Sequence, residues 1–182
     1  MSIVKEKQHT ASDALKAEFG YTNTMQAPRI EKVVVSVGIG SVKDKNKITL
    51  IQDRLAKITG QKPSACPAKK SVASFKVREG DIIGYQVTLR GKRMGAFLDK
   101  LVHVALPRTR DFRGLKRTIV DEMGNCTIGI KEHTIFPETS DEEIKDVFGL
   151  AITIVTSSDN KKEALAFLEH VGFPFRKEET KK

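Results

Sequence analysis

The stretch Ile30–Val37 reads IEKVVVSV, and it decides the fold class because its β-branched residues favour a strand that closes at Gly38. Downstream, the segment Asp44–Thr59 predicts an amphipathic helix. Its apolar residues recur at spacings of 3, 4 and 3: Ile48, Ile51, Leu55 and Ile58. Upstream, Ala11–Phe19 predicts a short helix that ends at Gly20. The first strand therefore lies between two helices.

The rest of the chain predicts further strands and helices in a mixed order. In sequence, they are the irregular segment Gln61–Lys70 with Pro63 and Pro67, the strands Ser71–Val77 and Ile82–Leu89, the helix Lys92–Ala105, the loop Pro107–Arg117, the turn Glu122–Asn125, the strands Cys126–Phe136 and Leu150–Thr156, and the helix Lys161–Val171. Arg78-Glu79-Gly80-Asp81 has good turn chemistry, which predicts a hairpin. Asp159 is the expected cap of the final helix.

This pattern predicts an α+β fold. We expect a mixed or antiparallel sheet with helices packed mainly on one face and the other face free for a partner. The 182 residues fit a single domain, 1–182, with a short N-terminal helix at about 11–19 and a charged tail at about 176–182.

Positive charge is concentrated in the middle third of the chain. The formal net charge is +9, but residues 61–120 alone carry 14 basic and 4 acidic side chains, whereas residues 121–182 are net acidic. Such a field attracts polyanions and predicts salt-sensitive binding. The alternative is a solvated basic surface without a partner.

Basic residues gather on several expected loops and strand ends around one sheet. The groups are Lys69-Lys70-Ser71, Phe75-Lys76-Val77-Arg78, Arg90 with Lys92 and Arg93, and Arg108 with Arg110 and Arg113. Arginine binds phosphate bidentately and lysine supplies a point charge. Phe75, near a turn, is a candidate for stacking on an unpaired nucleotide or, equally, a core residue.

Membrane insertion, secretion and metal binding have no support in the sequence. No apolar run approaches the roughly 18 residues of a membrane span, and the charged start lacks a secretory signal, so we expect a cytoplasmic protein. Cys66 and Cys126 form no CxxC pair and are expected to be small buried hydrophobes. The four histidines, His9, His103, His133 and His170, do not stand at metal-ligand spacing.

Nothing in the sequence favours catalysis, a cofactor or a small-molecule substrate. Gly38-Ile39-Gly40 lies between a strand and a helix but lacks the GK[ST] of a phosphate-binding loop. Asp141-Glu142-Glu143 is better explained as a helix start than as an acid–base or metal site. A phosphate-ligand enzyme using Gly38–Lys45 remains one alternative, and a free-standing RNA chaperone is another.

Several long strings, in order, resemble the bacterial large ribosomal subunit protein five family. They are APRIEKVVVSVGIG (27–40), ITGQKP (58–63), AKKSVASFKVREG (68–80), IGYQVTLRGKRM (83–94), ALPRTRDFRGL (105–115), GNCTIGIKEHTIFPE (124–138), ITIVT (152–156) and GFPFR (172–176). The resemblance extends from about Phe19 to Arg176. It implies an α+β ribosomal protein whose free sheet face binds 5S rRNA in the central protuberance. The implied further partners are 23S rRNA, P-site tRNA and a small-subunit head protein of family thirteen.

The resemblance also implies site residues. Those implied for 5S rRNA binding are Ser36, Gln61, Lys62, Lys69, Lys70, Ser71, Thr88 and Arg90. Those implied for the tRNA-contacting hairpin are Phe75, Lys76, Val77, Arg78 and Gly80. The loop implied at the inter-subunit contact carries Arg108, Arg110, Asp111 and Arg113.

At three places the sequence departs from the family pattern. Ser36 stands where asparagine is usual, and serine is shorter and lacks an amide donor. The turn VDEMGNC (120–126) replaces an FDGRGNY-type turn and loses an arginine and a tyrosine. The acidic stretch Thr139–Asp146 replaces a loop that usually contains tyrosine.

Overall fold

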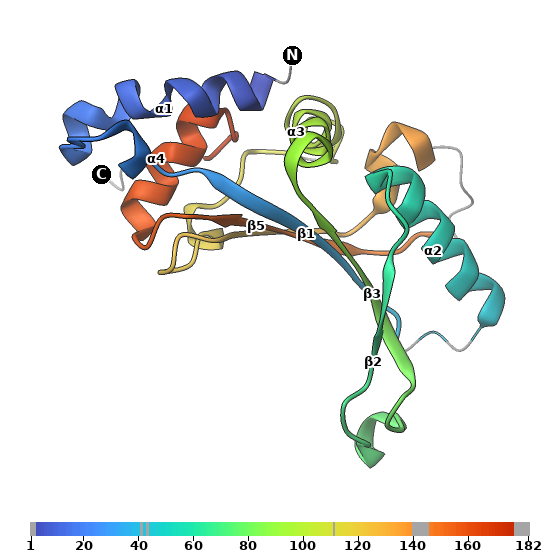
Figure 1. Cartoon of the computed structure of the whole chain (residues 1–182). Coiled ribbons are helices and arrows are strands. Elements are labelled where there is room, and N and C mark those ends of the chain that lie inside the picture. Colours follow the sequence, from blue (N-terminus) through green and yellow to red (C-terminus); the bar gives the residue numbers. More distant parts are fainter. Residues whose placement is uncertain (1–2, 41, 43, 111, 140–145, 177–182) are drawn as a thin grey trace, which may run out of the picture. The chain divides into compact units, whose positions relative to one another are not determined.

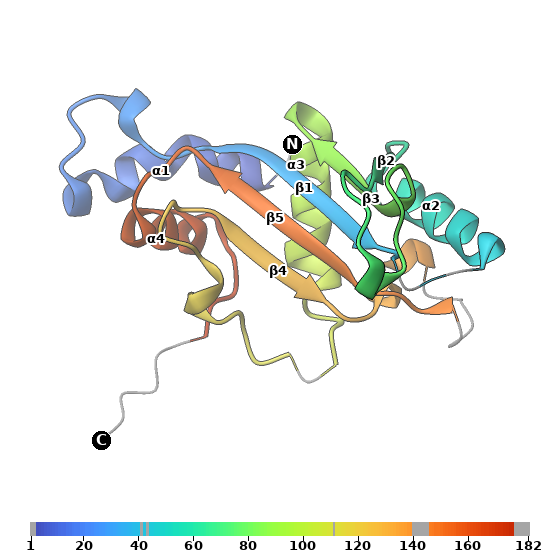
Figure 2. The ribbon, with the colours of Figure 1, turned by 90° about the horizontal axis from the view of Figure 1, so that it is seen from below.

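The computed structural model describes residues 3–40, 42, 44–110, 112–139 and 146–176. Within these residues, five strands form one sheet in the order β2-β3-β1-β5-β4. They are β1 (Ile30–Gly38), β2 (Ser64–Pro67), β3 (Ile82–Leu89), β4 (Cys126–Ile130) and β5 (Leu150–Thr156). The arrows of β1, β5 and β4 alternate in direction in Figure 2, and β2 pairs with β3 antiparallel. The predicted α+β class is confirmed.

Four α-helices accompany the sheet in the described part of the chain: α1 (Ile3–Phe19), α2 (Lys45–Thr59), α3 (Gly91–Lys100) and α4 (Lys161–Val171). The chain divides into two compact units. Unit 1 comprises Met1–Val33, Arg90–Ile128 and Thr153–Lys182, and unit 2 comprises Val34–Leu89 and Gly129–Ile152. Strands β1, β4 and β5 each contribute to both units, so the single-domain organisation stays a prediction.

In unit 1, helices α1, α3 and α4 cover one face of the strands (Figure 1). Helix α1 starts earlier than the predicted Ala11, because Val4 is only 1% exposed and its N–H donates to Asp99 Oδ1 at 3.0 Å. Helix α4 has its predicted bounds, but the cap prediction is wrong. Asn160, rather than Asp159, accepts a hydrogen bond from the N–H of Lys162 at 3.1 Å.

The predicted helix Lys92–Ala105 is confirmed, but its last five residues are π-helical and not α-helical. Helix α3 ends at Lys100, and Leu101–Ala105 continues it as a π-helical turn. The N–H of Leu106 closes this turn on the carbonyl of Leu101 at 2.9 Å. Pro107 follows, and it cannot donate the next helical hydrogen bond.

In unit 2, helix α2 confirms the amphipathic pattern, with Ile51, Leu55 and Ile58 buried. The hairpin prediction needs a correction. The partner of β3 is β2, which lies in the segment expected to be irregular, and Ser71–Val77 is not a strand. Pro67 is tolerated at the end of β2 because this is the edge strand, where a missing N–H breaks no interior hydrogen bond.

The predicted strand Cys126–Phe136 is too long, since β4 ends at Ile130. Beyond it the chain turns and buries His133, so the strand predicted at this histidine is wrong. The His133 ring stacks on Phe148 with centroids 3.9 Å apart. The N–H of His133 donates to the carbonyl of Phe148 at 3.1 Å, and the N–H of Phe148 donates back to His133 Nδ1 at 3.3 Å.

Burial alternates along the strands and so defines two faces of the sheet. The buried set is Val33, Val35 and Val37 in β1, Val87 and Leu89 in β3, Cys126, Ile128 and Ile130 in β4, and Leu150, Ile152 and Ile154 in β5. The intervening residues are half-buried or exposed and lie on the face that the helices leave uncovered. This confirms the expected helix-covered face and free face.

Candidate nucleic-acid interface

The uncovered sheet face of unit 2 carries polar side chains on β1 and β3. Ser36 in β1 and Gln86 and Thr88 in β3 occupy the half-buried positions between buried neighbours. Gln61, just after α2, joins them: its Nε2 donates to the carbonyl oxygen of Thr88 at 3.3 Å. Three of these four residues were predicted. Gln86 was missed, although its spacing of two from Thr88 places it on the same face.

Glycine at position 84 keeps β3 close to β1 on this face. A Cβ built there would lie 2.8 Å from the carbonyl oxygen of Val37. At the edge, Cys66 Sγ donates to Gln86 Oε1 at 3.8 Å, which ties β2 to β3 across their side chains. Ser36, Gln86 and Thr88 are therefore presented on closely packed backbone.

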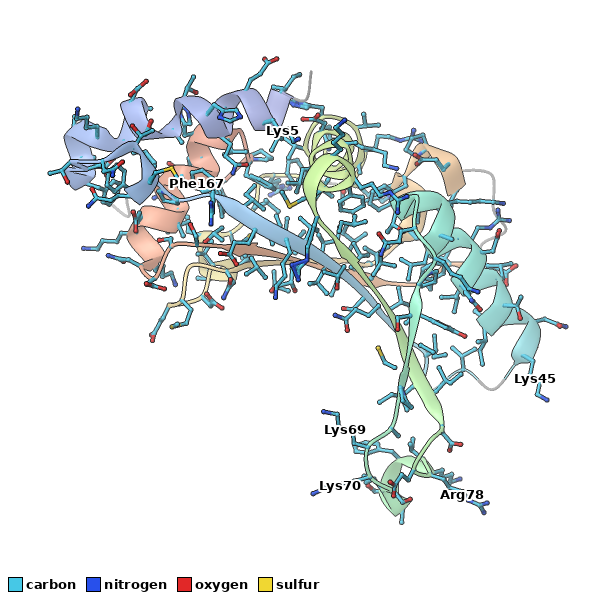
Figure 3. The ribbon with its side chains drawn as sticks, viewed as in Figure 1. Lys5, Lys45, Lys69, Lys70, Arg78 and Phe167 are labelled. Carbon is cyan, nitrogen blue, oxygen red and sulfur yellow. The ribbon has the colours of Figure 1, made fainter. Side chains whose placement is uncertain are left out.

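Lysines lie before and after the edge strand β2 in unit 2. Lys62 precedes β2, and Lys69 and Lys70 follow it; the side chains of Lys69 and Lys70 are exposed. Figure 3 shows Lys69 and Lys70 projecting from the loop beyond the β2–β3 ends, with Arg78 on the same loop. The Ser71 side chain is engaged locally, since its Oγ accepts the N–H of Glu79 at 2.9 Å. A phosphate would thus meet the lysines more readily than Ser71.

The loop Ala68–Asp81, which we call the β2–β3 loop, has its own hydrogen bonds. Val72 and Val77 bond each other, with N–O distances of 3.0 and 3.3 Å, and the N–H of Ala68 donates to the carbonyl of Asp81 at 2.8 Å. A 3-10 turn, Ala73–Phe75, forms the tip. The predicted hairpin tip is therefore a structured loop at the end of a hairpin.

The tip of the β2–β3 loop exposes an aromatic ring beside cations. The side chain of Phe75 is 77% exposed, which excludes the core interpretation. Lys76 has a φ of 53°, and Arg78 is exposed while its N–H donates to Asp81 Oδ2 at 2.8 Å. An apolar hollow of about 440 Å³ lies beneath, lined in part by Val72, Phe75, Val77 and Ile83 together with Lys69 and Lys70.

The remaining predicted basic residues belong to unit 1. Arg90 is exposed at the start of α3, whereas Arg108, Arg110 and Arg113 lie on the loop after the π-helical turn. The C-terminal part of that loop is anchored, because the N–H of Leu115 donates to the carbonyl of Pro174 at 2.7 Å. Asp111 lies outside the described residues.

The departures from the family pattern fall on ordinary structure. Asp121–Asn125 is a closed turn, as predicted, with the N–H of Asp121 donating to the carbonyl of Asn125 at 2.9 Å. Thr139 is buried and donates to the carbonyl of His133 at 3.0 Å. The acidic triplet predicted to start a helix, Asp141-Glu142-Glu143, lies outside the described residues, as does the tail beyond Arg176.

The glycine loop after β1 uses one of its backbone donors within the protein. The N–H of Ile39 is already used, because it donates to the carbonyl of Ile83 at 2.9 Å. Within residues 3–40, 42, 44–110, 112–139 and 146–176, no three His, Cys, Asp or Glu side chains converge as a metal site. Across the same residues, no helix combines the length and apolar character needed to cross a membrane.

The cysteines differ from each other. Cys126 is buried as expected, and burial, assisted by the charge of Asp121, raises the pKa of its thiol to about 12. Cys66 is half-buried at the sheet edge, so the prediction of burial is wrong for it. Both thiols are free.

Comparison with known proteins covers almost the whole chain. Residues 23–78 match the family described as ribosomal protein L5, and residues 82–175 match the C-terminus of the same ribosomal family. A relative from Trichlorobacter lovleyi is 51% identical over 170 residues, spanning 93% of this chain and 95% of the relative. One from Mycoplasma mycoides is 49% identical over 175 residues, spanning 96% and 97%. Both are named large ribosomal subunit protein uL5.

Proposed function

Because the chain belongs to the ribosomal L5 family, a structural and non-enzymatic constituent of the large ribosomal subunit, we propose that it binds 5S rRNA through the uncovered sheet face of unit 2. In the ribosome, and hence in the cytoplasm, it would anchor 5S rRNA in the central protuberance. Family membership excludes the alternative function of a phosphate-ligand enzyme that uses Gly38–Lys45.

One observation carries this proposal: the alternation of β1 and β3 leaves Ser36, Gln86 and Thr88 uncovered while their neighbours are buried. Hydroxyl and amide groups on a sheet can bond ribose 2′-hydroxyls, phosphate oxygens and base edges. The bond from Gln61 to Thr88 holds the Gln61 amide beside that face. Such positioning lowers the entropy lost on binding.

Cations would supply most of the affinity. Lys69 and Lys70 are exposed in unit 2, close in sequence to Lys62, and Arg90 is exposed in unit 1. Each phosphate contact releases condensed counterions, so each contributes about one unit to the salt dependence of log K. The polar sheet residues would then select the RNA shape, because lysine contacts with phosphates carry no sequence information.

The same proposal assigns the tRNA contact to the β2–β3 loop. Phe75 would stack on an unstacked base or ribose edge of P-site tRNA, and Lys76 and Arg78 would bind its phosphates. Val77 and Gly80 would hold the loop shape through their bonds to Val72 and Ala68. The loop arginines Arg108, Arg110 and Arg113 would face the small-subunit head protein, and 23S rRNA would be a further partner.

The test is a competition of RNAs against the purified chain. Binding to 5S rRNA, tRNA and an unrelated hairpin RNA is measured by filter retention at several salt concentrations. Thr88→Ala and Gln61→Ala should each weaken 5S binding about fivefold, the effect of losing roughly 1 kcal/mol of hydrogen bonding. Thr49→Ala is the matched control, since Thr49 lies on α2 and its hydroxyl donates to the carbonyl of Lys45.

Two variants separate the contribution of charge from the recognition of RNA shape. Lys70→Gln should lower the salt slope by about one without changing the preference among the RNAs. Thr88→Ala should reduce that preference with the slope unchanged. Equal affinity of the unmodified chain for all three RNAs would overturn the proposal and favour the RNA chaperone instead.

A further inference from the structure

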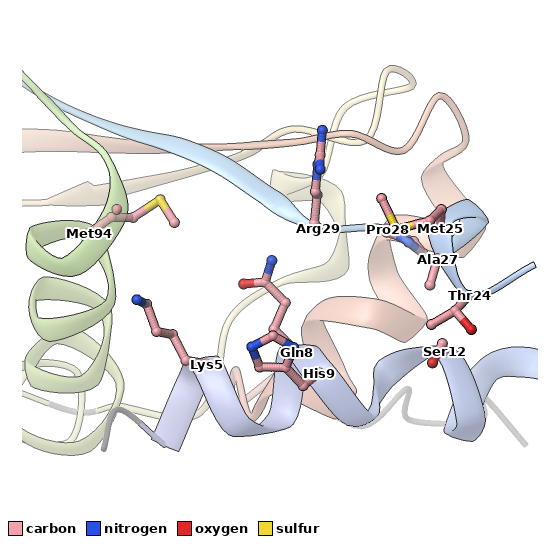
Figure 4. A pocket seen from close by; sticks show the side chains of 11 residues that line it. Lys5, Gln8, His9, Ser12, Thr24, Met25, Ala27, Pro28, Arg29 and Met94 are labelled. Carbon is pink, nitrogen blue, oxygen red and sulfur yellow. The ribbon is translucent and has the colours of Figure 1, made fainter.

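Unit 1 contains a hollow of about 350 Å³ that shares no residue with the interface described above. It lies between α1, the segment Thr24–Arg29 and the start of α3 (Figure 4). Helix α1 supplies Lys5, Gln8, His9 and Ser12. Lys5 and His9 are four residues apart, as are Gln8 and Ser12, so all four lie on one side of the helix. The volume falls in the range of about 300–1,000 Å³ typical of small-ligand sites.

The lining combines an apolar floor with a basic rim. Pro28 is buried and Met94 is only 7% exposed. Around them stand Lys5, His9 and Arg29, and none of the eleven lining residues is acidic. In Figure 4, Lys5 and Gln8 rise from α1 toward the opening, whereas the Arg29 side chain turns away from α1. An anionic ligand with an apolar face fits this distribution.

The lining also offers a hydroxyl group. Ser12 on α1 is only 7% exposed. Ser12 lines the hollow, and a ligand entering it would reach this hydroxyl.

We propose that this hollow receives one unstacked nucleotide of ribosomal RNA. The base lies on Met94 and Pro28, where the thioether sulfur can contact an aromatic ring. Gln8 and Ser12 bond its polar edge, and Lys5 binds the adjoining phosphate. The hollow is on the helix-covered side of unit 1 and shares no residue with the uncovered sheet face of unit 2.

The experiment follows the Met94 methyl resonance in the full-length protein, with methionine methyls labelled with ¹³C. The probe is a single-stranded hexauridylate at low salt, and hexaglutamate is the comparison polyanion. The Met94 methyl should shift with hexauridylate and not with hexaglutamate. Lys5→Gln should weaken the binding that this shift reports about five- to tenfold. Lys16→Gln is the matched control, since Lys16 is exposed on the same helix and outside the hollow.

The outcomes are distinct. An unmoved Met94 methyl, while hexauridylate binds elsewhere on the chain, overturns the proposal. An equal shift with hexaglutamate also overturns it and indicates an acidic protein partner. Thr88→Ala should leave the Met94 shift intact, and Lys5→Gln should leave the preference for 5S rRNA intact. Failure of the 5S rRNA proposal is thus distinguishable from failure of this one.

Discussion

Replacing Gly124 by alanine should destabilise unit 1, because the added Cβ would overlap neighbouring atoms. Gly20 is the matched position, where an added Cβ would meet no neighbour. Gly124 lies in the turn Asp121–Asn125 with a φ of +76°. A Cβ built there would lie 2.5 Å from the carbonyl oxygen of Ser158 and 3.2 Å from the Cβ of Ala164 in α4. Moving away is opposed by the Thr156 hydroxyl, which donates to the carbonyl of Gly124 at 2.8 Å.

Two costs add at this position. The left-handed conformation costs alanine about 1–2 kcal/mol relative to glycine. The overlap with backbone adds a further cost of about 1–3 kcal/mol, typical of an overpacked site. Gly20 isolates the first cost, because its φ is +70° and nothing lies within 4 Å of the Cβ that an alanine would carry there. We therefore expect Gly124→Ala to lose about 2 kcal/mol more than Gly20→Ala.

Thermal unfolding of both variants and the parent, followed by circular dichroism, measures this difference. For a chain of this size, 1 kcal/mol corresponds to about 2–4 °C in Tm. The Gly124→Ala midpoint should therefore lie roughly 4–8 °C below that of Gly20→Ala. Equal midpoints would refute the reasoning, because they would mean that the Ser158 carbonyl yields to a methyl group at no cost.

Further predictions concern single side chains. Because the pKa of the Cys126 thiol is raised, its contribution to the free energy of unfolding should be constant below about pH 9 and should fall as pH rises toward 12, by at most about 1.4 kcal/mol per pH unit. The free energy of unfolding of Cys126→Ala, measured over the same alkaline range, should lack this slope. The pKa of Tyr21 is raised by burial and by its bond to Glu163, so Tyr21→Phe should flatten the pH dependence above about 10. Phe75→Ala should leave Tm unchanged, since the ring is 77% exposed, while lowering tRNA affinity by about 1–3 kcal/mol in filter binding. Ser36→Asn, which restores an amide donor, should tighten 5S rRNA binding about fivefold in the same assay.

The sequence was most informative where one physical rule decided the structure. The β-branched runs Ile30–Val37 and Leu150–Thr156 became β1 and β5, and the spacing of apolar residues located α2. It failed where tertiary contacts override local preference. β2 is a short strand with a terminal proline, so only its position at the sheet edge makes it a strand. α1 begins in a polar stretch whose start is fixed by the distant Asp99.

The candidate site likewise has a part that the sequence predicted and a part that depends on tertiary structure. Composition predicted the exposed basic loops, because solvated charge is a local property of the sequence. The polar face needed the strand register as well. Gln86 could have been found from its spacing to Thr88, but Gln61 lies outside any strand, and its bond to the carbonyl of Thr88 spans 27 positions. The hollow beside α1 had no signal in the sequence, since Gly91 and Met94 are far along the chain from the other residues that line it.

Charge alone would make this chain a binder of any RNA, so selectivity has to come from groups with fixed positions. Lysines on the β2–β3 loop are exposed and adaptable, and such contacts carry no sequence information. Ser36, Gln86 and Thr88 sit on backbone held close by the glycine at position 84, where even a methyl group would meet the Val37 carbonyl. Small changes in their side chains should therefore alter which RNA is preferred, whereas changes in the lysines should alter mainly how tightly any RNA is held.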